Sequence, residues 1–98
     1  MLVHPLKISD LEQLRHHVYQ TLCDHEQLEH GIFEMTERIL VRGGAPCGIY
    51  FCLHGPRNVK YTAIWETDRD TILYYGCGGE RFGKTRLTAA PGLVPVAA

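Results

Sequence analysis

The chain has 98 residues, with ten lysines and arginines against eleven aspartates and glutamates, which gives a formal net charge of −1. A chain of this length supports one modest hydrophobic core and one domain, which excludes barrel enzymes and large nucleotide-driven machines. The near-zero charge argues against a dominant nucleic-acid or anionic-membrane surface, because proteins with such surfaces normally carry a clear excess of basic residues.

The first ten residues contain no basic leader followed by a long apolar run, so we expect neither a secretory signal nor a membrane-spanning helix. The setting we expect is the reducing cytoplasm, where cysteines pack as small apolar residues and do not form a disulfide framework. The chain has four cysteines: Cys23, Cys47, Cys52 and Cys77.

A helix is predicted to begin near Ser9, because Ser9 and Glu12 have the three-residue spacing of a capping box. Leucine and valine then recur every three or four residues and give this helix one apolar stripe, which must face a core. Gly31 is a natural stop, since glycine tolerates the left-handed backbone conformation that ends many helices. The stripe consists of Leu11, Leu14, Val18 and Leu22.

From Ile32 onward the apolar period changes to two, and β-branched and aromatic residues alternate between turn sequences. The predicted strands cover residues 33–41, 48–54, 59–67, 71–75 and, more weakly, 81–87. The short connections between them predict hairpins. The fold class is therefore α+β, with an N-terminal helix packed on a four- to five-stranded antiparallel meander that is open or curled into a half-barrel. Residues 1–88 form this single domain, and residues 89–98 form a flexible C-terminal tail without periodicity.

Both faces of the two central strands carry large apolar side chains, whereas one helix can cover only one face. The other face must close into a barrel, be covered by the tail or meet another chain. We therefore expect a non-enzymatic domain without catalytic residues, acting as a homo-oligomer or with a protein partner and without membrane association. The interaction residues we expect are Tyr50, Tyr61, Trp65 and Tyr74.

Residues 78–85 match the phosphate-loop pattern G-x-x-x-x-G-K-[ST]. Such loops bind phosphate at the start of a helix, and too few residues follow Thr85 for that helix and its parallel strands. We therefore expect no cofactor and favour a glycine-rich turn followed by an edge strand, with Lys84 and Arg86 pointing outward. A small-ligand or phosphate-binding module stays open as an alternative. Its anion site would consist of Gly78, Gly79, Gly83, Lys84 and Thr85.

The chain has six histidines and four cysteines but neither a C-x-x-C pair nor two histidines three or four residues apart. The spacings of zinc fingers and of helical histidine pairs are therefore missing, and we expect no metal. Cys52 and His54 are the weak metal candidates, because they share one face of a predicted strand. Ser9 is the only serine, which removes Ser-His-Asp catalysis.

Single-stranded RNA binding on the sheet face is a further alternative, because an open sheet with aromatic and basic side chains can stack bases. The chain lacks the aromatic string of RNA-recognition motifs, so nucleic acid is not the partner we expect. The basic residues behind this alternative are Arg38, Arg42, Arg57, Lys60, Arg81, Lys84 and Arg86, and the aromatic ones are Tyr50, Tyr61, Trp65, Tyr74 and Tyr75.

Residues 39–44, 48–57 and 63–68 carry a resemblance to a known group of sequences. Together with the rest of residues 36–87, they resemble short bacterial proteins of about this length. The resemblance implies a small stand-alone cytosolic domain. It implies no particular activity and no functional residues.

Overall fold

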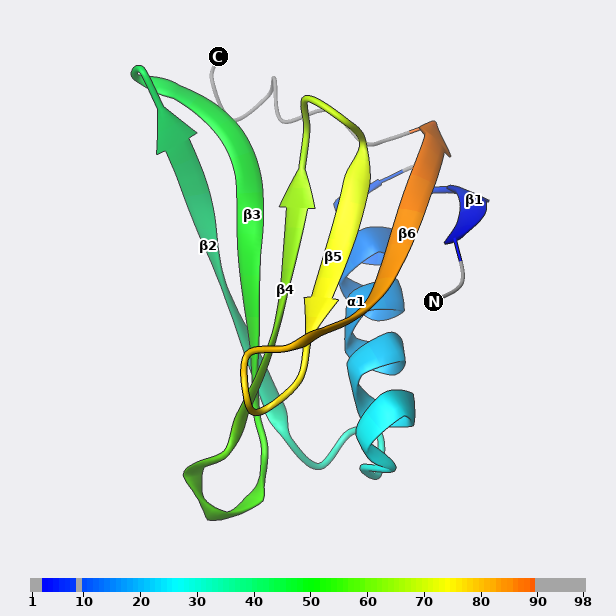
Figure 1. Cartoon of the computed structure of the whole chain (residues 1–98), viewed down its shortest axis with the longest axis vertical. Helices are drawn as coiled ribbons and strands as arrows, with labels where there is room; N and C mark the ends of the chain where they lie inside the picture. Colours follow the sequence, from blue (N-terminus) through cyan, green and yellow to red (C-terminus); the bar gives the residue numbers. More distant parts are fainter. Residues whose placement is uncertain (1–2, 9, 90–98) are drawn as a thin grey trace.

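A short strand, one helix and a run of five further strands follow one another in the computed structural model, which describes residues 3–8 and 10–89 (Figure 1). The alternation read from the sequence thus produces strands where it was expected, and the α+β class is confirmed. The elements are β1 (Val3–Lys7), α1 (Leu11–Glu26), β2 (Glu34–Arg42), β3 (Ala45–His54), the 3₁₀ turn η1 (Pro56–Asn58), β4 (Lys60–Glu66), β5 (Thr71–Tyr75) and β6 (Arg81–Ala89).

The strands form one sheet in the order β1-β6-β5-β4-β3-β2. From β2 to β6 each strand pairs antiparallel with the next in the chain, as the short connections predict. β1 pairs in parallel with β6, so β6 is not the edge strand that the sequence predicted. The sheet is not closed into a barrel, since β1 and β2 lie at its opposite ends. Of the predicted tail, only Ala89 belongs to the described residues, and there it ends β6.

The helix begins one residue later than Ser9 would have placed it. Asp10 is the N-cap, and its carboxylate accepts a hydrogen bond of 2.8 Å from the backbone N–H of Gln13. This bond satisfies one of the backbone donors that the first turn of a helix leaves free. Ser9 itself lies outside the described residues, so the capping box remains a prediction.

The helix ends at Glu26, earlier than the sequence predicted. Gln27 adopts a left-handed conformation with φ 57°, and its N–H bonds to the carbonyl of Asp24. Leu28 then packs against the core. This burial turns the chain away before Gly31, and the prediction that Gly31 ends the helix was wrong.

The predicted apolar stripe of the helix faces the sheet, as expected. Leu14, Val18 and Leu22 are completely buried, while Leu11 is partly buried against the same core. Figure 1 shows α1 lying over one face of the sheet, which we call the core face. The buried side chains that this face contributes are Ile49, Phe51, Leu53, Tyr61, Ala63, Trp65, Ile72, Tyr74, Thr85 and Leu87. In the part of the chain that the structure describes, no helix is long and apolar enough to cross a membrane.

Candidate functional site

The second face of the sheet points away from α1. Side chains of directly paired residues point to the same side of an antiparallel sheet, so the strand registers define which residues share this face. Among the described residues, α1 is the only α-helix, and it lies on the other side. We call this surface the open face; it consists of Glu34, Thr36, Arg38, Leu40, Tyr50, Cys52, His54, Lys60, Thr62, Ile64, Glu66, Thr71, Leu73, Tyr75, Arg81, Lys84 and Arg86.

Charge is distributed unevenly between the open face and the rest of the chain. The open face carries five basic side chains against Glu34 and Glu66, a net charge of +3. Since the whole chain carries −1, the remaining residues carry −4. The near-neutral composition therefore conceals a basic face on an otherwise acidic molecule. The five basic residues are Arg38, Lys60, Arg81, Lys84 and Arg86.

A hollow of about 310 Å³ lies on the open face beside Tyr50. Arg38 from β2, His54 from β3 and Lys60 from β4 line it, together with the tyrosine. The Nε2 atom of His54 lies 2.9 Å from the hydroxyl oxygen of Thr36, which fixes the imidazole against β2. Cations from β2 and β4 thus line the hollow together with one aromatic ring, an arrangement suited to an anionic group next to a flat one, although Glu37 also lines it.

The predicted metal candidates, Cys52 and His54, do share the open face. Cys52 is buried, with 7% of its surface exposed, and a nitrogen of His54 is engaged with Thr36. Within the described ranges, no three side chains of histidine, cysteine, aspartate or glutamate come together as metal ligands would. The structure therefore adds no further ligand to this pair.

The five phosphate-site candidates do not converge on one site. Gly78 and Gly79 precede β6 in a turn, whereas Gly83, Lys84 and Thr85 lie inside the strand. Because successive side chains of a strand alternate, Lys84 lies on the open face and Thr85 on the core face. The Thr85 hydroxyl accepts a buried hydrogen bond of 3.0 Å from Tyr74. The segment pairs as a strand and does not begin a helix, so it lacks the geometry of a phosphate loop, and the small-ligand alternative stays a prediction.

Three of the four predicted interaction residues are buried in the core. Tyr61, Trp65 and Tyr74 are 7%, 1% and 1% exposed, and only Tyr50 lies on the open face. This corrects the prediction, and the reason is that α1 covers the face on which the other three lie. The same burial removes three of the five aromatic residues behind the RNA alternative and leaves Tyr50 and Tyr75.

The outer edge of β2 is the second surface of interest. No other strand in the described part of the chain pairs with this edge, and β2 exposes Ile39 and Val41 to 39% and 62%. The β2–β3 hairpin extends past the start of α1, as Figure 1 shows. We call strand β2 with these two side chains the β2 edge. The sequence predicted both residues within a strand, residues 33–41, but did not identify that strand as an exposed edge.

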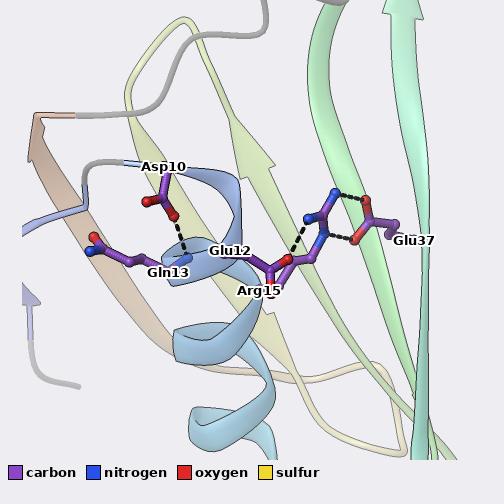
Figure 2. A network of polar contacts seen from close by, with 5 residues as sticks. All are labelled: Asp10, Glu12, Gln13, Arg15 and Glu37. Carbon is purple, nitrogen blue, oxygen red and sulfur yellow. Dashed lines mark hydrogen bonds and ion pairs between the residues drawn. The ribbon is translucent and has the colours of Figure 1, made fainter.

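An ion pair holds the first half of β2 against the helix. Arg15 of α1 donates to both carboxylate oxygens of Glu37, at 2.7 and 3.0 Å, and to Glu12 at 2.9 Å (Figure 2). The hydrogen bonds to Glu37 raise the pKa of the Arg15 guanidinium above its ordinary value. A two-pronged contact of this kind fixes geometry as well as adding attraction, so it aligns β2 on the sheet.

Three titratable groups between α1 and the sheet have pKa values shifted in favour of their neutral forms. Burial, with a smaller effect of His16, lowers the pKa of His17, whose ring meets that of Tyr74 edge-on. Burial likewise raises the pKa of the Tyr74 phenol and of the Cys23 thiol. Desolvation disfavours the charged form of each group.

The chain matches no family model, no curated protein and no solved structure. Its resemblance to short bacterial proteins therefore stays a prediction. The open face and the β2 edge are the two surfaces from which function can be inferred.

Proposed function

We propose that this protein is a self-associating domain in which the β2 edge pairs with the β2 edge of a second copy. The observation that carries the proposal is the position of β2, a nine-residue strand at the end of the sheet with no further strand paired to it among the described residues. An edge strand presents a row of backbone donors and acceptors that can form a ladder with another strand. The domain then acts by contact and not by catalysis.

Exposed apolar side chains strengthen the case for this edge. Ile39 and Val41 are two of the three large hydrophobic residues that the described chain exposes most. A strand paired to β2 would cover part of both, and removing apolar surface from water favours association. β2 contains neither proline nor lysine, two common devices against edge pairing, although four of its nine residues are charged.

The charges along β2 are compatible with antiparallel pairing of two copies. Full overlap of the two strands places Glu34 opposite Arg42 of the second copy at both ends, while Arg38 faces its own counterpart at the centre. Directly opposed pairs contribute about 0.2–1 kcal/mol each, favourable for unlike and unfavourable for like charges, so two favourable pairs outweigh one unfavourable pair. Arg42 meets Asp68 only through an exposed contact of 3.5 Å, which is weak enough to exchange.

The state of the cysteines supports a cytoplasmic setting for this function. All four cysteines are free thiols, and Cys77 is exposed. Exposed thiols persist in a reducing compartment, whereas an oxidising one favours their conversion to disulfides. We therefore retain the cytoplasm as the proposed location.

The oligomeric state tests the proposal. We expect sedimentation velocity to give a dimer for the unaltered chain and a monomer for Val41→Lys, because this change replaces apolar surface that pairing would cover with a charge. Ile32→Lys is the matched control, since Ile32 and Val41 are both 62% exposed but Ile32 precedes β2. A monomeric parent at every concentration would overturn the proposal, and so would equal dissociation by the two variants.

A further inference from the structure

The strand registers arrange the open face into rows that run across the sheet. One row crosses five strands as Arg38, Tyr50, Ile64, Leu73 and Lys84. Its three central side chains are half-buried, and a cation stands at each end. Four steps between strands make this row about 19 Å wide at 4.7–4.9 Å per step. An apolar centre between two cations, Arg38 and Lys84, is thus presented on the side away from α1.

Two tyrosines on the open face are placed to bind two separate flat groups. Tyr50 belongs to β3 and Tyr75 to β5, with β4 between them. On β4, Ile64 pairs with Tyr50 and Thr62 pairs with Tyr75, so the two tyrosines lie in adjacent rows. Two strand steps and two residues along a strand separate them by about 12 Å. Each ring can stack on one base of an extended nucleic acid, which holds its bases unpaired.

The charges restrict which partner fits this surface. A second copy of the chain would bring one face of charge +3 against another, which like-charge repulsion disfavours. A polyanion instead meets Arg38 and Lys60 beside the hollow at Tyr50, and Lys84 with Arg86 at the other margin. An acidic peptide would use the cations but would leave the two tyrosines without a stacking partner.

We propose that the open face binds single-stranded RNA, with phosphates along the basic margins and bases stacked on Tyr50 and Tyr75. The choice of RNA over DNA rests on Thr62, which lies in the row of Tyr75 between the two rings and offers a hydroxyl to a ribose 2′-hydroxyl. This function goes beyond self-association and uses side chains other than Ile39 and Val41.

Fluorescence anisotropy with a labelled single-stranded RNA of about 12 nucleotides tests the proposal, a length within the range that single-stranded sites cover. We expect binding that weakens with salt, with a log–log slope of about −3 for four phosphate contacts at 0.7 each. Lys84→Gln should reduce this slope by about 0.7. Arg57→Gly is the matched control: it removes one positive charge from η1, where the left-handed φ of 59° suits glycine, and should leave the slope unchanged.

The tyrosines and Thr62 supply the sharper variants. Tyr50→Ala should weaken binding about tenfold, the effect of losing one stacked base, while Tyr50→Phe keeps the ring and should restore it. Thr62→Val should remove the preference for RNA over DNA of the same sequence and leave DNA binding unchanged. Circular dichroism of each variant establishes that it is folded before its affinity is compared.

Four outcomes would overturn this proposal. These are no binding by the parent chain, a flat salt response, equal affinity for duplex RNA or for poly-glutamate, and equal affinity for single-stranded DNA. The short RNA is also titrated against Val41→Lys. Unchanged affinity of Val41→Lys for this RNA supports RNA binding whether or not the chain dimerises. A failure of the RNA proposal is thereby distinguishable from a failure of the dimer proposal.

Discussion

Tyr74 and Tyr75 are neighbours in β5 with opposite roles. Tyr74 lies in the core and donates a hydrogen bond of 3.0 Å to the hydroxyl of Thr85, whereas Tyr75 lies half-buried on the open face. Burial raises the pKa of Tyr74, so its phenol remains protonated and can donate. Because side chains alternate along a strand, the ring of Tyr74 contributes to the core and the ring of Tyr75 to the open face.

Tyr74→Phe should lower the free energy of unfolding by about 1–3 kcal/mol, because it leaves the buried Thr85 hydroxyl without its partner. Tyr75→Phe is the matched control and should change the free energy of unfolding by less than about 0.5 kcal/mol, as is usual for surface positions. Urea denaturation monitored by tryptophan fluorescence measures both.

A double variant separates the hydrogen bond from packing. Thr85→Val added to Tyr74→Phe should recover most of the lost stability, since replacing both partners by apolar groups removes the unsatisfied oxygen. If the double variant is instead less stable than Tyr74→Phe, the hydrogen bond does not account for the effect.

At the scale of the elements, the end of α1 shows a position where the native residue is not the most stable one. Gln27 is exposed and holds φ at 57°, a conformation that costs residues with a Cβ atom more than glycine. Gln27→Gly should raise the free energy of unfolding by about 0.5–1 kcal/mol.

Gln20→Gly is the matched control for this prediction. It makes the same substitution at an exposed position inside the helix, where glycine costs about 1 kcal/mol relative to good helix formers. Thermal unfolding should therefore move in opposite directions for the two variants. A loss of stability in both would mean that the left-handed conformation at Gln27 carries no strain.

The helix and strands that are specified by patterns within one short segment were predictable from the sequence. Leu14, Val18 and Leu22 recur every four residues, and the side chains of β3 and β4 alternate every second residue. Each pattern therefore specifies a buried face from residues that are close together in the sequence. The pairing of β1 with β6 was not predictable, because it joins segments from the two ends of the chain and no local pattern encodes it. Contacts between distant segments depend on the assembled core.

The two surfaces were predictable only in part for the same reason. Alternation separates Tyr50 from Phe51 along β3, but both sets of side chains include large apolar groups, so the sequence does not say which set α1 covers. The prediction therefore combined Tyr50 with Trp65, which lie on opposite faces. The basic charge of the open face was hidden too, because its members come from β2, β4 and β6 and meet only through the strand registers.

At the scale of the whole molecule, the open sheet relates the two proposed surfaces geometrically. The β2 edge lies at one end of the sheet, and the open face extends from it across the other strands (Figure 1). Antiparallel pairing of two β2 strands requires a two-fold axis perpendicular to the sheet, and this axis keeps both helices on one side and both open faces on the other. A dimer of this kind presents two basic faces as one continuous surface.

Such a dimer should bind a long RNA strand more tightly than a short one, because a long strand can contact the open faces of both copies. Once one face holds the strand, the second face meets a high local concentration of the same molecule, and linked sites of this kind can gain a factor of about 100 or more in affinity. We therefore expect an RNA of twice the length of the short strand to bind the parent chain at least about 100-fold more tightly than the short strand does. Val41→Lys should remove this gain and leave the affinity for the short strand unchanged, whereas Ile32→Lys should preserve both. Anisotropy titrations of the two RNA lengths against the three proteins measure the effect. An equal gain in the monomeric variant would show that length acts through a single face and not through the dimer.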